Sequence, residues 1–285
     1  MNPKNKLLSF EYFDVGIQKG ILDLNLLYSD AHDRTSFEKK WPEFFASDST
    51  HLDIFKREED DLIVYRTESL IPIQTDGRPP VLMLFGNPAS RSVYSGMFFS
   101  FEGAHKEHRF WIALRNTGFL EFRSNASGLQ LRWDERNRIR KEEFINLEYQ
   151  SPFRIGLEVF FSIPSASSHP QWSGVSGLQR LFGREAMHRI AAAEEQRIEN
   201  IIEKFNYHGG GVITFQRDAY EGVRASDTPA YKLSTALSGA LLGKYKHDPR
   251  IRLLGAPPTR TLHSQKARDV LVQFKTRLLE GPDLV

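Results

Sequence analysis

Four short, uninterrupted apolar segments constrain most strongly what this chain can fold into. Each is of strand length, is rich in β-branched or aromatic residues, and ends at a glycine, serine or other polar break. Unbroken rather than alternating hydrophobicity is typical of strands that are buried on both faces, as in a parallel sheet. The four segments are VLMLF (81–85), LEVFF (157–161), GVITF (211–215) and RIRLL (250–254).

Segments with helical character lie between and after these strands. Residues 184–205 place apolar side chains at the i, i+3, i+4 spacing of an amphipathic helix, and residues 107–118 end at a glycine suited to cap a helix. Residues 234–245 are rich in Ala and Leu, and residues 264–280 begin at a serine N-cap and stop at Gly-Pro. Strands that alternate with helices predict an α/β fold, here a three-layer αβα domain around a four-stranded, mainly parallel sheet.

The N-terminal part of the chain has a different character. Residues 1–78 are rich in aromatic and charged side chains and contain none of the four apolar segments. We therefore expect an N-terminal extension, residues 1–78, packed on an α/β domain of residues 79–285.

Composition excludes several classes of function. The 285 residues include no cysteine, which rules out disulfides, thiolate catalysis and cysteine-held iron–sulfur clusters, and favours an intracellular, cytoplasmic protein, nucleoid-associated if the chain is bacterial. No apolar run reaches the roughly 18 residues of a membrane span. The nine histidines show no metal-binding spacing, so we expect no metal and no cofactor. A net charge of +2 is compatible with DNA as a partner without demonstrating it. We expect a monomer.

The loops that follow the four strands are where function is expected. In open α/β sheets, ligands bind outside the carboxyl ends of the strands. The four loops should therefore converge on one edge and form a polar cleft. Their sequences are GNPASRS (86–92), SIPSASSHP (162–170), QRDAYEG (216–222) and GAPPTRTLHS (255–264).

The first of these loops opens a longer pattern. An Asn-Pro pair follows the strand, a glycine lies nine positions beyond the asparagine, an aromatic residue comes three positions later, and a Phe-Trp pair opens the next helix. The pattern resembles the first signature of the uracil-DNA glycosylase superfamily, and most closely its mismatch-specific uracil/thymine-DNA glycosylase branch. A weaker, positional similarity extends over residues 80–280. The residues that match the signature are Asn87, Pro88, Gly96, Phe99, Phe110 and Trp111.

The resemblance implies a monofunctional DNA-base N-glycosylase of base excision repair. Such an enzyme flips a deaminated or mismatched base, uracil or a similar one, out of DNA and hydrolyses its N-glycosidic bond. By the match, Asn87 is the catalytic residue that positions the attacking water, and Phe99 stacks on the flipped base. The other residues that the resemblance places at the base are Gly86, Pro88, Ala89 and Ser162.

The resemblance also implies where DNA is held. The loop before the last helix stands where the family inserts a wedge into the vacated base stack, and here Arg260 lies three residues beyond Pro257. Basic side chains nearby would add phosphate contacts that do not depend on sequence. The expected DNA-binding residues are Arg91, Pro257, Pro258, Thr259, Arg260, Lys266 and Arg268.

Two departures from the family keep other functions open. Ser162 stands where many members carry a base-reading asparagine, and a hydroxyl cannot make the bidentate contact of an amide. Ala256 stands where the fastest members carry a histidine. Both departures favour a non-catalytic relative that binds DNA or senses lesions, or an interaction module. A third alternative, a small-molecule enzyme on a similar sheet, is favoured by the modest net charge.

Overall fold

The computed structural model describes residues 6–58, 61–101, 106–125 and 131–280, and the chain divides into two compact units. The first unit consists of Met1–Ser69, Asn87–Phe98 and Val159–Ile198. The second consists of Leu70–Gly86, Phe99–Glu158 and Glu199–Val285. Each unit is thus assembled from three separate segments of the chain. The predicted extension of residues 1–78 stays a prediction, and most of that segment shares its unit with residues 87–98 and 159–198.

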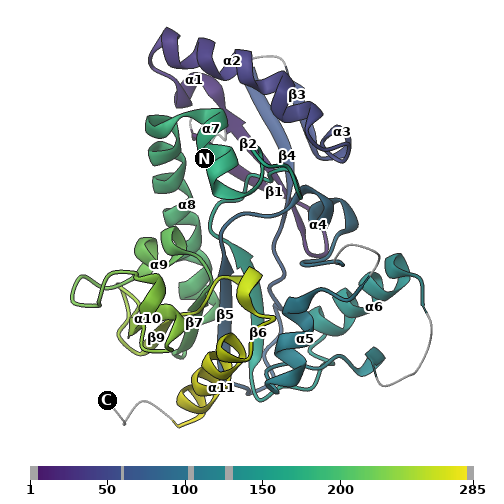
Figure 1. Ribbon diagram of the computed structural model, residues 1–285, viewed down its shortest axis with the longest axis vertical. Coiled ribbons are helices and arrows are strands. Elements are labelled where there is room, and N and C mark those ends of the chain that lie inside the picture. The colour runs from purple at the N-terminus through teal and green to yellow at the C-terminus, as the bar shows by residue number, and fades with distance from the viewer. Residues whose placement is uncertain (1–5, 59–60, 102–105, 126–130, 281–285) are drawn as a thin grey trace. The chain divides into compact units, whose positions relative to one another are not determined.

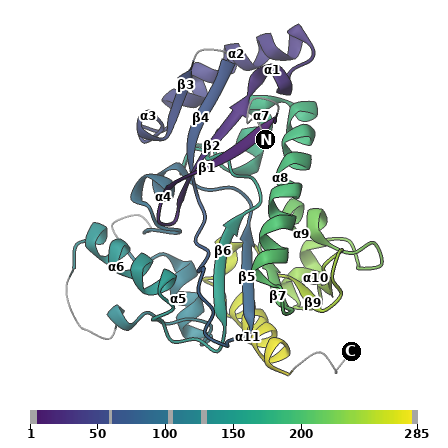
Figure 2. The ribbon, with the colours of Figure 1, turned by 180° about the vertical axis from the view of Figure 1, so that it is seen from behind.

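The first unit contains a four-stranded antiparallel sheet in the order β1-β2-β4-β3 (Figure 2). Strands β1 (Leu8–Asp14) and β2 (Ile17–Asp23) form a hairpin, and Gly16 in its turn has a φ of +77°, which glycine adopts without strain. Strand β4 (Leu62–Glu68) lies between β2 and β3 (Phe55–Glu58). This sheet was not expected from the sequence: β1, β2 and β3 mix polar and apolar residues, and the apolar run of β4, Leu62–Tyr65, is followed directly by Arg-Thr-Glu.

Helices of the first unit pack aromatic side chains against one another. Phe37 of α2 stacks on Phe182 at 5.5 Å between ring centroids, and Phe44 of α2 meets Trp172 edge-on at 6.1 Å. All four rings are buried, so this cluster forms part of the core. The helices are α1 (Leu24–Leu27), α2 (Ala31–Ala46), α3 (His51–Ile54), α4 (Ser90–Ser95), α7 (Gly174–Phe182) and the first part of α8 (Arg184–Phe205).

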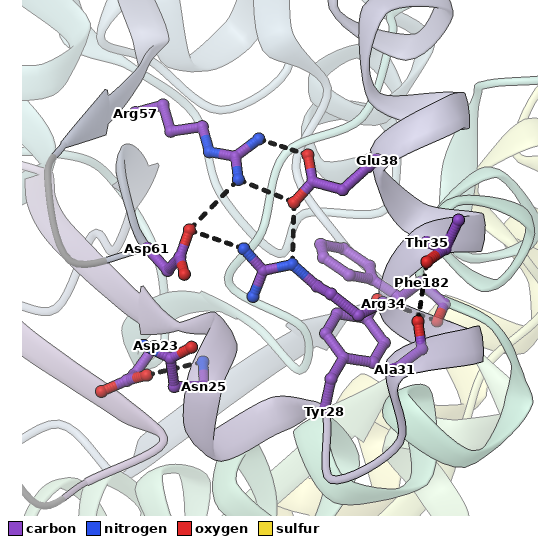
Figure 3. Close-up of polar contacts among 10 residues, drawn as sticks. All are labelled: Asp23, Asn25, Tyr28, Ala31, Arg34, Thr35, Glu38, Arg57, Asp61 and Phe182. Carbon is purple, nitrogen blue, oxygen red and sulfur yellow. Dashed lines mark hydrogen bonds and ion pairs between the residues drawn. The ribbon is translucent and has the colours of Figure 1, made fainter.

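An ion-pair network fixes α2 against the β3–β4 hairpin (Figure 3). Arg34 contacts Glu38 at 2.7 Å and Asp61 at 2.6 Å, while Arg57 contacts Glu38 at 2.6 Å. The hydrogen bond from Arg57, opposed by burial and aided by Arg34, holds the pKa of Glu38 below its usual value. The side chains are partly exposed, so each pair contributes at most about 1 kcal/mol, and the network serves mainly to orient the helix.

The second unit contains a five-stranded sheet in the order β6-β5-β7-β9-β8. Strands β6, β5, β7 and β9 are labelled in Figure 1. Strand β7 (Gly210–Thr214) lies parallel to both β5 (Pro80–Phe85) and β9 (Ile251–Gly255). Strand β6 (Arg154–Val159) forms one edge. All four apolar segments therefore form strands, and the prediction of a mainly parallel sheet is confirmed. The predicted number of strands is wrong, because β8 (Leu242–Lys244) adds an antiparallel fifth strand beside β9.

The fifth strand also explains an error in the predicted helices. Residues 234–245 were expected to form one helix, but α10 covers only Leu233–Leu237, and Gly239 has a left-handed φ of +73°. Leu242 and Lys244 then pair with Leu254 and Arg252 of β9. The edge of β9 offers hydrogen-bonding groups that pair with this segment, and this tertiary pairing prevails over the helical preference of Ala and Leu.

The other predicted helices are confirmed. Helix α8 covers Arg184–Phe205, α5 covers Arg109–Asn116 within the predicted 107–118, and α11 covers Gln265–Leu279 within the predicted 264–280. Ser264 caps α11 as expected, because its side chain accepts a hydrogen bond from the Ala267 amide at 3.2 Å. Helices α5 and α11 lie next to one another (Figure 1), and Lys275 donates to the Thr117 carbonyl at 2.7 Å. The remaining helices of this unit are α6 (Trp133–Ile145) and α9 (Arg217–Val223).

Candidate functional site

Asn87 is the second residue after β5, and its side-chain amide donates hydrogen bonds to three acceptors. The Nδ2 group donates to Ser165 Oγ at 2.9 Å, to the Pro88 carbonyl at 3.2 Å and to the Ile163 carbonyl at 3.4 Å. The side chain is half-buried. The hydrogens of the amide nitrogen are therefore taken up by acceptors within the protein. Oδ1 is the atom of this side chain that can still accept a hydrogen bond from a ligand or water.

The loop of Asn87 and the loop after β6 are joined by backbone hydrogen bonds. The Ser90 amide donates to the Ser165 carbonyl at 2.9 Å, and the Ser165 amide donates to the Pro88 carbonyl at 3.1 Å. Ala89 and Ser165 thereby form a parallel bridge. Two of the four loops expected to converge do lie together in the first unit. The third and fourth loops follow neighbouring strands of the second unit, and the convergence of all four stays a prediction.

Asp48, between α2 and α3, connects both of these loops to the N-terminal segment. Its Oδ2 accepts from Ser90 Oγ at 2.7 Å and from the Ser167 amide at 3.0 Å, and its Oδ1 accepts from the amide and hydroxyl of Thr50 at 3.1 and 2.7 Å. Burial raises the pKa of Asp48, but the hydrogen bonds from Ser167, Ser90 and Thr50 outweigh it and hold the pKa well below its usual range. The carboxylate is therefore ionised at neutral pH and clamps the two loops.

Ser162, expected to contact a base, lies in a buried polar network. Its amide donates to Glu194 Oε1 at 2.6 Å, its hydroxyl forms a very short hydrogen bond with the same oxygen, and Tyr65 Oη lies 2.6 Å from Ser162 Oγ. Arg197 contacts the other oxygen of Glu194 at 2.6 Å. Ser162 and Glu194 are fully buried. In this arrangement both hydrogen-bonding partners of the hydroxyl come from the protein, which is the satisfaction that buried polar groups require.

The tyrosine of this network is accommodated by a glycine on the neighbouring strand. Gly20 of β2 pairs with Tyr65 of β4, and a Cβ atom on Gly20 would lie 2.3 Å from the Tyr65 ring. Burial raises the pKa of Tyr65, so its hydroxyl stays protonated at all physiological pH values.

Phe99 lies in an aromatic cluster of the second unit. Its ring centroid is 4.5 Å from that of Phe110, 4.7 Å from that of His108 and 5.0 Å from that of Phe85. The backbone of Phe99 has a left-handed φ of +49°, and its carbonyl accepts from the Trp111 indole at 3.1 Å. A bulky residue in this conformation is strained, and such strain is concentrated at functional sites. Phe99 is half-buried.

The strand order places this aromatic cluster where a ligand is expected. The chain leaves β5 toward β6 on one side and leaves β7 toward β9 on the other, so the direction of the connections reverses between β5 and β7. Ligands of open α/β sheets bind at such a switch point, outside the carboxyl ends of the strands. Phe85 and Phe215, at or just beyond these ends, stack at 5.1 Å. Gly86, expected at the base, is the next residue after Phe85 and is half-buried.

The loop before α11 is tied down by two arginines. Arg109 donates to the Arg260 carbonyl at 3.0 Å, and Arg268 donates to the His263 carbonyl at 2.7 Å. The side chains of Arg260 and Lys266 are exposed, whereas Arg268 also contacts Gln265 at 2.9 Å. Arg268 is therefore placed to shape the loop, and Arg260 and Lys266 present positive charge to solvent. Of the remaining expected contacts, Pro257 and Pro258 precede a short 3₁₀ helix, Thr259–Thr261, and Thr259 is its first residue.

The expected site residues are divided between the two units. The first unit holds Asn87, Pro88, Ala89, Arg91 and Ser162, and the second holds Gly86, Phe99 and the loop before α11. Arg91 is exposed, and its backbone amide donates to Ser167 Oγ at 2.9 Å. Their roles in base and DNA binding stay predictions.

The side chains that hold the Asn87 loop were not among the residues predicted from the sequence. Ser165 and Ser167 lie in the second loop, whose serine-rich composition indicated a polar site without singling out either residue. Ser90 lies within the Asn-Pro loop itself. Asp48 carried no signal, because nothing in the sequence near it relates it to residues more than 40 positions away.

Comparison with known proteins leaves the family open: no protein-family model matches this chain, and a search of curated proteins found no match. Within the described residues, no three His, Cys, Asp or Glu side chains are grouped so that they could hold a metal ion. No helix in that part of the chain is long and apolar enough to cross a membrane.

Proposed function

We propose that this chain is a monofunctional DNA glycosylase of base excision repair. It hydrolyses the N-glycosidic bond of a deaminated or mismatched base such as uracil, as a monomer and without metal or cofactor. The observation that carries the proposal is the spaced signature from Gly86 to Trp111, with an asparagine whose amide oxygen is left for a ligand. We also propose that helices cover both faces of the five-stranded sheet, so that the domain has three layers.

The role proposed for Asn87 comes from the resemblance, and the hydrogen bonds of its amide are compatible with it. Oδ1 accepts a hydrogen from a water molecule and aims its oxygen at the sugar carbon C1′. A bond forms between the water oxygen and C1′ while the C1′–N bond breaks, and the departing base takes the bonding electron pair. An amide is a poor proton acceptor, so the water proton passes to the base or to solvent as the reaction completes. Donors that stabilise the anionic base supply the rest of the acceleration.

The strained, half-buried Phe99 supports a stacking role at the base. A flat ring next to Phe110 and Phe85 offers an apolar face, and a flipped base is usually held between aromatic or apolar side chains. Arg260 and Lys266, exposed at the loop before α11 and at the start of that helix, supply the positive charge that phosphate contacts require.

One observation favours a second candidate, a DNA-binding or lesion-sensing relative without catalysis. Ser162 is fully buried and bonded to Tyr65 and Glu194, so the position that carries a base-reading asparagine in many members presents no free polar group in this arrangement. A protein that binds damaged DNA by stacking and charge does not need that contact.

The first test is release of free base from single- and double-stranded oligonucleotides that carry uracil, hypoxanthine or a mismatched thymine. We expect release by the parent protein, its loss in Asn87→Ala, and full activity in Asn116→Ala, a matched change at an exposed position of α5. Absence of release from every substrate would contradict the enzymatic proposal. Retained binding to lesion-containing DNA in that case would favour the non-catalytic relative.

A further inference from the structure

The orientation of the Asn87 amide is decided by backbone carbonyls. Nδ2 lies 3.2 Å from the Pro88 carbonyl and 3.4 Å from the Ile163 carbonyl, and both oxygens can only accept hydrogen bonds. If the amide were turned over, Oδ1 would face these two oxygens with no hydrogen between them. The position that faces the Pro88 and Ile163 carbonyls therefore requires a hydrogen-bond donor. Nδ2 occupies it, and Oδ1 points away from the two carbonyls.

Ser165 supplies the shortest of the three contacts, and it is itself held in place. Its hydroxyl oxygen accepts from Asn87 Nδ2 at 2.9 Å and from the Gly174 amide, at the start of α7, at 2.8 Å. The residue is buried, and its backbone is bonded to Pro88 and Ser90 on both sides. A side chain so fixed can set the position of another, because neither partner is free to move independently.

We propose that Ser165 is the positioning residue of the candidate site and that residue 87 must be an amide there. Ser165 and the two carbonyls hold Nδ2, so that Oδ1 is aimed outward at the water or ligand. The orientation itself rests on the contacts described, and only the role of Oδ1 in aiming a water rests on the proposed function.

The proposal makes aspartate a poor replacement for Asn87. A carboxylate has no hydrogen to donate, so one of its oxygens would face the Pro88 and Ile163 carbonyls and lose the attraction that the amide gains. Asp48, whose carboxylate is bonded to Ser90 and Ser167 of the same two loops, is the charged group that the described contacts place at this cluster, and it too disfavours a second negative charge. The new carboxyl group should therefore have a raised pKa.

The first experiment follows the Asn87 side-chain amide by NMR in the full-length protein, identified as the side-chain pair that is missing in Asn87→Ala. We expect its hydrogens to exchange with solvent roughly tenfold faster in Ser165→Ala, because a hydrogen bond of ordinary strength is lost. Exchange should be unchanged in Ser168→Ala, an exposed serine of the same loop. Equal exchange in the parent protein and Ser165→Ala overturns the proposal, and this readout needs no activity.

The second experiment measures unfolding of Asn87→Asp by urea between pH 3 and pH 8. A carboxyl group whose pKa is raised in the folded state binds more protons in the folded protein than in the unfolded chain. The free energy of unfolding of Asn87→Asp, relative to that of the parent protein, should therefore fall as the pH rises above about 4. Parallel stability curves for Asn87→Asp and the parent protein would contradict an amide-selective site. Asn116→Asp, at an exposed position, controls for the added charge.

The third readout separates positioning from the proposed reaction. If the parent protein releases base, we expect Ser165→Ala to lower kcat about tenfold with KM nearly unchanged, because the variant misaims Asn87 without altering the base-stacking ring. An unchanged kcat in folded Ser165→Ala overturns the positioning role. If the parent protein releases no base while exchange and pH results hold, the proposed function fails and the positioning of Asn87 by Ser165 stands.

Discussion

Phe99 combines a left-handed backbone with a ring that contacts the rings of Phe85, His108 and Phe110. The Trp111 indole anchors its carbonyl, and the φ of +49° turns the chain so that the ring joins His108 and Phe110. An L-residue in this conformation costs about 1–2 kcal/mol relative to the right-handed form. The spacing of the signature identified Phe99 as a candidate, but the strain that supports a functional reading is visible only in the backbone.

This strain predicts an inverted order of stability at position 99. Phe99→Gly and Phe99→Ala both lose the ring, but glycine adopts a positive φ without cost. We therefore expect Phe99→Gly to be more stable than Phe99→Ala by about 1 kcal/mol in urea unfolding.

The control for this prediction is the same pair of substitutions at Phe101. Phe101 is half-buried as well, and positive φ among the described non-glycine residues is confined to positions 61, 99 and 147. There the glycine variant should be the less stable one. If the alanine variant were more stable than the glycine variant at both positions, the Phe99 backbone would not be left-handed in solution.

At the scale of elements, the loop after β5 is held by contacts from distant parts of the chain. The loop after β6 supplies Ser165 and Ser167, and the turn between α2 and α3 supplies Asp48. The strands that carry the loops could be predicted from their unbroken apolar runs. The contacts could not, because they depend on which loops the fold brings within hydrogen-bonding distance.

The ionised Asp48 predicts a specific loss of stability in acid. Its folded pKa is depressed, so the unfolded chain binds a proton more readily, and the stabilisation is complete at neutral pH and is lost as the pH falls below about 4, toward the folded value. Asp48→Asn should be less stable than the parent protein at pH 7 by about 1.5–3 kcal/mol, the range for hydrogen bonds to a charged group.

The measurement is urea unfolding at pH 7 and pH 3. We expect the difference in free energy of unfolding between the two proteins to be smaller at pH 3. At that pH the parent protein has begun to lose the stabilisation by the ionised Asp48 carboxylate, which the variant lacks at every pH. Asp53→Asn, an exposed aspartate of α3, should follow the parent protein throughout. A gap between parent and Asp48→Asn that is as wide at pH 3 as at pH 7 would show that the Asp48 charge is not what stabilises the loops.

At the scale of the whole molecule, each unit is built from three segments that are distant in sequence. Within the first unit, Phe37 and Phe44 of α2 pack on Phe182 and Trp172. This interleaving means that the N-terminal segment shares its core with residues from the middle of the chain.

A fragment of residues 79–285 should therefore lose the structure of the first unit. Without the N-terminal segment, Trp172 and Phe182 lose the aromatic partners Phe44 and Phe37, and Ser162 loses its hydrogen bond with Tyr65. We expect lower thermal stability and red-shifted Trp172 fluorescence relative to the full chain. To isolate Trp172, Trp111 and Trp133 are replaced by phenylalanine in both proteins, and Trp41 is replaced as well in the full chain. A fragment with the unfolding midpoint of the full chain would show that residues 1–78 are a dispensable extension.

Strands β5, β6, β7 and β9 and helices α5, α8 and α11 could be predicted from the sequence alone. Their signals are local: unbroken apolar runs, a 3.6-residue period and caps at the ends. The sequence also singled out Asn87 and Phe99 as candidates by their spacing. Three features became apparent only in the folded chain: residues 242–244 form a strand, Ser162 is buried against Glu194, and Ser165 orients Asn87. Each of these outcomes depends on a partner that the chain must fold to meet, 78 residues away in the case of Asn87 and Ser165.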